Sequence, residues 1–450
     1  MTTEFPQIVP AGVVTQEFRT VESVRKGIIA GVVGNMLEWY DFALFGFFAP
    51  QIGAHFFPAT NPTASLLAAY GTFAAGFLMR PIGGAFFGYI GDKFGRKQAL
   101  LWSVLAMALP SFCIGLLPSE ATIGLVAPVL LLVFRLLQGL AVGGEYMASS
   151  VFLVEGALPG KRGLMGAWSP FGCFAGTLLG SAAGLIVNTV LPPTAVMAYG
   201  WRIPFLFGIL VALGGIIIRR NFVEKVPHQP PAKSPIGEAF RLHWRTILHL
   251  ILLVAGLSVG FYTTFVYSAT WLKQVAGVSA KTGFEINTIA MALSLAAVLL
   301  AGGLSDRFGR RAVVAVITGV LMVVSYPLMA WMAGGQWIAV FVGQVVLSLL
   351  VSAAAGVLAS TMAELAPWRV RCTVLSISYN FGVALLGGTT PLVAAWLVSR
   401  TGFSLAPAVY LAIAGALSFI GALALPRTMP HRLTTEFQSV RARTAARPVA

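Results

Sequence analysis

The sequence has few charged residues. Only 10% of its 450 residues are Asp, Glu, Lys or Arg, whereas a typical soluble domain has about 25%. Hydrophobic residues make up 57%, so a soluble fold could not cover its surface with polar side chains. This composition also excludes a disordered chain, a collagen-like chain and a disulfide scaffold, the last because the sequence has only three cysteines. We therefore predict an all-α polytopic membrane protein.

Several catalytic signatures are also missing. The sequence contains no Walker loop, no HExxH motif and no nucleophile elbow. The five histidines and three cysteines form no set at metal-ligand spacing. We therefore predict neither an enzyme, nor ATP-driven transport, nor a metal site.

Long apolar stretches divide the chain. A helix needs about 20 mostly apolar residues to cross a bilayer. Twelve stretches fit: 28–50, 64–90, 98–117, 123–150, 164–189, 202–219, 246–272, 283–304, 312–333, 337–362, 372–398 and 405–425. The prolines and basic residues of 220–245 indicate a linker. The predicted order is an amino tail (1–26), a six-helix bundle (27–220), a linker (221–245), a second six-helix bundle (246–425) and a carboxyl tail (426–450).

Basic residues gather on one side of these spans. If the amino terminus is cytoplasmic, the tails and loops on that side contain 24 of the 30 Lys and Arg, and the opposite loops contain four. Positive residues favour the cytoplasmic side, so we expect both termini there and a multi-pass protein of the plasma membrane. The basic excess is spread over short loops, which suits anionic lipid rather than nucleic acid. The expected partners are the lipid bilayer and a small-molecule substrate, and the expected state is a monomer.

One motif occurs twice, in corresponding loops of the two halves. GxxxDxFGR followed by a basic residue occupies 88–97 and 302–311, 214 residues apart, and a Glu followed seven residues later by an Arg occurs in both halves. This register indicates a duplication. We predict that these charges pair across helix ends as a conformational latch, the alternative being plain positive loops with turn glycines. The latch residues are Asp92, Arg96, Glu155, Arg162, Asp306, Arg310, Glu364 and Arg371.

Four segments carry a family resemblance: 34–42, 80–83, 135–139 and 143–146. Over about 25–425 the chain resembles the major facilitator superfamily, with two pseudo-symmetric six-helix halves. Within it the chain is similar to the metabolite:proton symporter family, which includes permeases for citrate, α-ketoglutarate, shikimate and proline/betaine. The resemblance implies alternating access, in which proton entry drives uptake of a small carboxylate-bearing solute, with no cofactor beyond the proton.

The resemblance leaves the solute open between a di- or tricarboxylate and a zwitterionic osmolyte such as proline or betaine. Osmosensing proline/betaine permeases carry a long heptad-patterned carboxyl tail, whereas about 25 residues without sustained heptads follow the last predicted span here. A membrane receptor or sensor on the same fold is the alternative function. Such a protein would be expected to add a signalling domain or to lose its charges within the spans.

Five ionisable side chains lie inside the predicted spans, where each costs about 2.5–3.5 kcal/mol at the bilayer centre. They are Glu38, Asp41, Arg80, Arg135 and Glu145. Because removal from water favours the neutral form of a carboxyl group, we predict that Glu38, Asp41 or Glu145 carries the coupled proton. Guanidinium groups match carboxylates, so Arg135 with Gln138 is the candidate for binding the substrate carboxylate. A structural Arg–Glu network is the alternative.

The second half offers amides, hydroxyls and aromatic rings instead of charges. The remaining candidates for substrate binding are Asn35, Arg80, Tyr262, Gln344, Tyr379 and Asn380. Tyr262, Tyr267 and Trp271 together would suit a quaternary ammonium. Aromatic residues also fill membrane cores, and we favour that interpretation for these three.

Overall fold

The computed structural model describes residues 21–94, 96–143, 145–158, 160–209, 213, 235–367 and 370–427, and its regular elements are helices. The first group is α1 (Val21–Phe47), α2 (Ala49–Phe56), α3 (Pro62–Leu78), α4 (Arg80–Phe94), α5 (Arg96–Leu116), α6 (Glu120–Ile123), α7 (Val126–Val142), α8 (Glu145–Glu155), α9 (Arg162–Val190), α10 (Pro193–Ala195) and η1 (Val196–Gly200). The second is α12 (Pro235–Phe261), η2 (Tyr262–Tyr267), α13 (Ser268–Val275), α14 (Ala280–Phe308), α15 (Arg310–Ala333), α16 (Trp337–Leu365), α17 (Arg371–Gly382), η4 (Val383–Gly388), α18 (Thr390–Thr401) and α19 (Ala406–Leu423).

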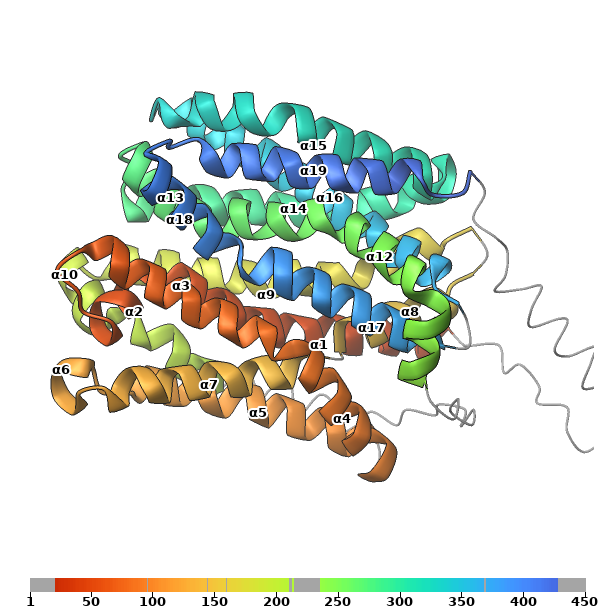
Figure 1. The fold of residues 1–450 in the computed structure, drawn as a ribbon, viewed down its shortest axis with the longest axis horizontal. Helices are drawn as coiled ribbons and strands as arrows, with labels where there is room; N and C mark the ends of the chain where they lie inside the picture. Colours follow the sequence, from red (N-terminus) through yellow and green to blue (C-terminus); the bar gives the residue numbers. More distant parts are fainter. Residues whose placement is uncertain are drawn as a thin grey trace, which may run out of the picture.

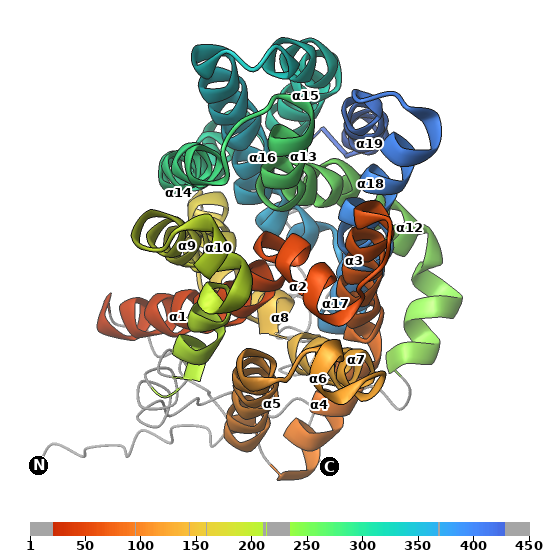
Figure 2. The ribbon, with the colours of Figure 1, turned by 90° about the vertical axis from the view of Figure 1, so that its left-hand side faces the viewer.

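These helices form two groups that lie side by side (Figures 1 and 2). We call residues 21–209 the amino half and residues 235–427 the carboxyl half. Between the halves, α9 packs on α14 and α16, α3 packs on η4 and α18, and α17 packs on α4 and α8. In the described part of the chain, nine helical stretches are long and apolar enough to cross a membrane, and a shorter apolar helix covers Trp102–Leu116. The count of twelve spans stays a prediction.

Large apolar side chains cover the outside of the molecule as well as its core. Leu109, Val129, Leu300 and Val316 are each more than half exposed and lie on α5, α7, α14 and α15. In water such surfaces would be driven together, whereas hydrocarbon chains solvate them without cost. The outer surface therefore agrees with a protein surrounded by lipid.

Several predicted spans are interrupted rather than continuous. The second is made of α3 and α4, which meet at Met79, and Pro81 stands in the first turn of α4, where its missing N–H costs no hydrogen bond. Spans seven and eleven contain the π-helical segments η2 and η4. The predicted linker ends within α12, which begins at Pro235 and has a non-helical residue at His243. The first of these breaks sets Arg80 at the start of a helix in the interior.

Glycines bring α3, α4 and α7 into backbone contact. A Cβ atom at Gly83 would lie 1.9 Å from the carbonyl oxygen of Leu140, and one at Gly139 would lie 1.8 Å from that of Gly76. Small residues at such crossings let helices approach closely in a membrane. This packing fixes the positions of Arg80 and Arg135 relative to each other.

Candidate transport site

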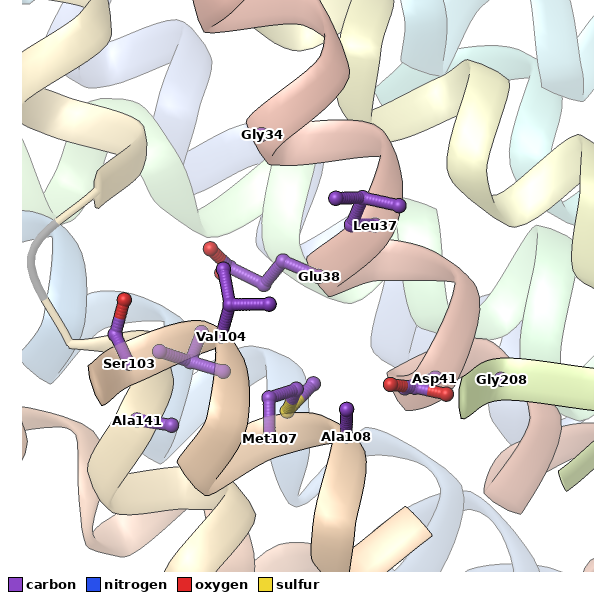
Figure 3. A pocket seen from close by; sticks show the side chains of 11 residues that line it. Gly34, Leu37, Glu38, Asp41, Ser103, Val104, Met107, Ala108, Ala141 and Gly208 are labelled. Atoms are coloured by element: carbon purple, nitrogen blue, oxygen red, sulfur yellow. The ribbon is translucent and has the colours of Figure 1, made fainter. Parts of the chain in front are cut away.

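A pocket inside the amino half contains two of the predicted proton carriers. It lies between α1, α5, α7 and the helical residues 202–209. Glu38 and Asp41 point into it from α1, and they are the only charged residues in its described lining (Figure 3). Gly208 faces Asp41 so closely that a Cβ atom there would lie 2.8 Å from Oδ1. We call this the acid pocket.

Arg80 connects the acid pocket with the carboxyl half. Its Nη2 lies 3.8 Å from Oε1 of Glu38, and its Nε donates to Oδ1 of Asn380 at 3.4 Å. The amide of Asn380 in turn donates to the carbonyl of Gly143 at 2.5 Å. The Arg80 side chain is 2% exposed, so its charge is separated from water and depends on these partners.

Arg135 occupies a different environment. Its guanidinium carbon lies 4.7, 4.3 and 5.1 Å from the ring centres of Phe42, Phe45 and Phe73. Nη1 donates to Oε1 of Gln138 at 2.8 Å, whereas Nε and Nη2 have no hydrogen-bond partner among the described residues. Three rings stabilise the cation by cation–π contact, and two of its donor nitrogens stay available.

A second cavity lies between the two halves. We call it the central cavity. Its lining is Trp39, Tyr146, Pro170, Cys173 and Phe174 from the amino half, and Leu257, Ser258, Phe261, Tyr262, Ala355, Tyr379 and Val383 from the carboxyl half. Trp39 follows Glu38 on α1, so this helix is a wall of both pockets.

Charged contacts close one end of the interface between the halves. Asp306 accepts hydrogen bonds from the backbone N–H groups of Gly163 and Leu164, at 2.7 and 2.9 Å, at the start of α9. The carboxylate thus lies at the positive end of that helix. Arg371 donates to Glu155 at 2.5 Å, which joins α17 to α8. We call this side of the molecule the latch end.

Neutral contacts close the opposite end. The hydroxyl groups of Tyr70 and Thr270 are 2.9 Å apart, and Asn287 donates to Ser181 at 3.2 Å. The ring of Phe284 meets that of Phe47 at 5.7 Å. The two halves therefore touch at this end as well as at the latch end.

The predicted latch residues separate into three groups. Asp306 and the pair Glu155–Arg371 join the two halves, as the latch interpretation requires. Within the carboxyl half, Arg310 lies 2.9 Å from Asp306 and 3.1 Å from Glu364. Nε of Arg162 has no hydrogen-bond partner among the described residues. The side chains of Asp92 and Arg96 lie outside those described.

The predicted substrate residues are likewise divided. Tyr262 and Tyr379 line the central cavity, and Arg80 and Asn380 meet at its edge. The other four, Asn35, Arg135, Gln138 and Gln344, do not line it. Asn35 donates to Ser149 and Ser169 within the amino half, Gln344 donates to Asn287 and to the carbonyl of Thr264, and Gln138 donates to Ser111. The side chain of Glu145, the third predicted proton carrier, is not among those described.

Sequence reasoning missed most of the central cavity. Trp39 and Tyr146 belong to the segments that carry the family resemblance, each directly after an acidic residue, and that adjacency is the signal that could have found them. Phe174, Phe261 and Ser258 stand in apolar stretches where nothing distinguishes a cavity wall from packing.

Comparisons with known proteins agree on the family. The family of sugar (and other) transporters matches residues 27–229. A glycine betaine/proline/ectoine/pipecolic acid transporter of Dickeya dadantii is 36% identical over 90% of this chain and 84% of its own length. A proline/betaine transporter of Salmonella typhimurium is 35% identical over the same shares of the two chains.

Solved structures agree on the fold. A proton:xylose symporter bound to 6-bromo-6-deoxy-D-glucose superposes with a TM-score of 0.72 at 16% identity, over 91% of this chain and 96% of its own. A partially occluded inward-open xylose transporter from E. coli has a TM-score of 0.66 at 17% identity, over 89% and 96%. At this identity the likeness establishes the fold alone.

Proposed function

Because the chain belongs to the major facilitator superfamily, as a relative of proline/betaine transporters and not of enzymes, we propose that it is a proton-coupled symporter. It takes up a small carboxylate-bearing solute across the cell membrane by alternating access. Both termini and the latch end face the cytoplasm, and twelve spans in two bundles, 27–220 and 246–425, cross the bilayer. The protein works as a monomer.

The observation that carries this proposal is the place of Arg80 between the two pockets. Its guanidinium carbon lies 6.0 Å from the ring centre of Trp39 and 5.9 Å from that of Tyr379, both in the wall of the central cavity. On its other side is Glu38, in the wall of the acid pocket. One cation is therefore within reach of a titratable carboxyl group and of a solute.

This position supplies a coupling mechanism. When Glu38 is ionised it attracts Arg80, and when it is protonated that attraction is lost. Arg80 is then free to bind a solute carboxylate from the central cavity. Asp41, in the same pocket, lies within electrostatic range of Arg135 and provides a second protonation site. Protonation inside the amino half thus favours solute binding between the halves.

Solute binding then favours rearrangement of the halves. The walls of the central cavity come from both of them, so a solute seated there contacts both. Opening toward the cytoplasm requires Asp306 to leave the start of α9 and Arg371 to leave Glu155. These contacts are few, which allows them to form and break in each cycle.

A zwitterionic osmolyte fits the cavity better than a di- or tricarboxylate. No described residue of the lining carries a charge, and Arg80 is the only described cation whose contacts include the rings of that lining. One arginine balances one carboxylate, whereas a second or third carboxylate would be buried without a partner. The names of the two sequence relatives agree with this choice.

Transport in proteoliposomes tests the proposal. With an acid exterior, we expect wild-type protein to accumulate trimethylglycine or proline above the external concentration, and a protonophore to abolish the accumulation. Citrate and α-ketoglutarate represent the other solute class. A receptor or sensor built on this fold would bind a solute without accumulating it, so binding without accumulation of any of the four would refute the proposal.

A further inference from the structure

We propose that Asn380 is a positioning residue, which holds Arg80 at the interface between the halves and releases α17 only after Arg80 has turned to the solute. The inference rests on the proposed symport function and specifies how the position of one arginine controls opening at the latch end. Its observations are the two hydrogen bonds of the Asn380 side chain, the close crossing of helices beside it, and the break in the span that follows it.

Asn380 joins the two halves through a single buried amide. It lies in the last turn of α17 and is 3% exposed. Its Oδ1 accepts a hydrogen bond from Nε of Arg80 at 3.4 Å, and its Nδ2 donates to the carbonyl oxygen of Gly143 at 2.5 Å. Among the described residues, both partners of this side chain therefore belong to the amino half, although α17 belongs to the carboxyl half.

The backbone around these two partners is fixed by a close helix crossing. A Cβ atom at Gly143 would lie 2.2 Å from the carbonyl oxygen of Arg80, and one at Gly84 would lie 3.1 Å from the carbonyl oxygen of Gly143. Glycine is needed where two backbones approach this closely. The start of α4 and the end of α7 thus hold each other in place, and the side chain of Arg80 is the part that is left to move.

The hydrogen bond from Arg80 orients the amide of Asn380. An asparagine amide accepts through its oxygen and donates through its nitrogen, so a cationic donor at Oδ1 directs Nδ2 to the Gly143 carbonyl. In this structure Arg80 also lies 3.8 Å from Glu38. When Arg80 turns from Glu38 to a solute, Oδ1 loses its donor while it is buried, which is unfavourable. The contact of α17 with the amino half is therefore weakest when solute is bound.

The segment after Asn380 gives α17 a place to bend. α17 ends at Gly382, and the π-helical segment η4 separates it from α18. π-Helical turns often interrupt helices at functional sites. Because η4 packs on α3 whereas α17 packs on α4 and α8, bending at η4 would move α17 relative to α18.

Cys173 can report the opening, because it lines the central cavity and is 3% exposed. In a Cys113→Ala/Cys372→Ser background, the rate of N-ethylmaleimide labelling of purified, solute-free protein measures how often the cavity opens. Asn380→Leu and Arg80→Met each remove the hydrogen bond between these residues, and we expect each to speed labelling at least about 10-fold. An unchanged rate in either variant would overturn the proposal.

The double variant Asn380→Leu/Arg80→Met tests whether the two residues act through one contact. It should match the faster single variant within about 3-fold, because both changes break the same contact. Independent roles would instead give the product of the two effects, at least about 100-fold, and that product would overturn the proposal. Should Asn380→Leu fail to fold, Asn380→Ala removes the same two hydrogen bonds with a smaller side chain.

The matched control is Arg371→Met on the same helix. Arg371 joins α17 to Glu155 at the latch end, in a separate contact with the amino half. Its effect on labelling should therefore multiply with that of Arg80→Met. Equal behaviour of the Arg371–Arg80 and Asn380–Arg80 pairs would overturn the proposal.

Binding and accumulation distinguish positioning from contact with the solute. Asn380→Leu leaves Arg80 available, so we expect its affinity for trimethylglycine to stay within about 3-fold of wild type. Its accumulation ratio in proteoliposomes should fall at least about 10-fold, because the halves open without solute. A loss of affinity of about 10-fold or more would assign Asn380 to solute contact and overturn the positioning role.

The outcomes separate this inference from the proposed function. Proton-driven accumulation by the wild type, with effects of Asn380→Leu and Arg80→Met that multiply, would overturn the positioning role and leave symport intact. Effects that do not multiply, in a wild-type protein that accumulates none of the four solutes, would support the positioning role and refute symport.

Discussion

We expect the pair formed by Glu38 and Arg80 to make the affinity for a solute depend on whether Glu38 is protonated. If an ionised Glu38 competes with the solute carboxylate for Arg80, affinity falls as pH rises and Glu38 loses its proton. Replacing Glu38 with Gln keeps the shape of the side chain and removes its charge. The variant should therefore bind solute with the same affinity at low and high pH.

The size of the effect follows from the distance. Two unit charges about 4 Å apart attract each other by about 4 kcal/mol at an effective dielectric constant of 20, and the Glu38–Arg80 separation is 3.8 Å with both side chains buried. Desolvation and sharing of the five guanidinium donors offset part of this attraction. A net competition of about 1.4 kcal/mol already gives a 10-fold change. We expect wild-type affinity to be about 10-fold or more lower where Glu38 is ionised than where it is protonated, with an upper limit of about 1,000-fold.

Titration calorimetry with trimethylglycine on the purified protein, at a series of pH values, measures this directly. Glu38→Gln should match the wild type at low pH and exceed it at high pH. Glu120→Gln is the control, because Glu120 lies in α6 at the end opposite the latch and outside the walls of both pockets. Loss of affinity in Glu38→Gln at every pH, or an unchanged pH dependence, would refute the competition.

Three further changes probe other parts of the molecule. Asp306→Ala removes the acceptor of the Gly163 and Leu164 N–H groups, so amide hydrogen exchange over 160–170 should become faster. The control is Arg307→Ala, which changes the exposed residue next to Asp306. Equal exchange in the two variants would contradict the latch. Gly139→Ala forces α7 away from the carbonyl of Gly76 and should destabilise the fold by about 1–3 kcal/mol in thermal unfolding. The control is Gly71→Ala on α3, where a Cβ atom would meet open space, and this variant should unfold at or above the wild-type temperature. A similar loss of stability in both variants would refute the close packing of α7 on α3. Arg80→Gln should weaken binding of trimethylglycine by at least about 10-fold at low pH, where Glu38 no longer competes with the solute for Arg80. Undiminished binding would show that Arg80 does not bind the solute.

Charge was the most informative feature of the sequence. Ionisable side chains inside apolar stretches are costly enough to mark function, and Glu38, Asp41 and Arg80 do lie at the two pockets. The repeated motif likewise singled out Asp306, because the motif occurs at corresponding loops of the two halves and can be recognised whatever the composition around it. These features could be predicted since each departs from an apolar background.

Contacts between the halves could not be predicted. Helical periodicity places Arg135 and Gln138 on one face, but which cavity that face meets depends on how α3 and α7 cross at Gly76 and Gly139. The pairing of Arg371 with Glu155 depends in the same way on how the halves pack, since the two residues come from different halves. The stacking of Tyr146 on Tyr379 also joins residues of different halves, and neither sequence segment specifies that pairing.

Solute-dependent proton uptake is the most direct measurement of the central claim. In proteoliposomes without an imposed gradient, trimethylglycine added outside should make the external medium more alkaline with wild-type protein. The double variant Glu38→Gln/Asp41→Asn, which removes both carboxyl groups of the acid pocket, should bind trimethylglycine and leave the external pH unchanged. Alkalinisation by the double variant equal to that by the wild type would contradict the assignment of the coupled proton to the acid pocket.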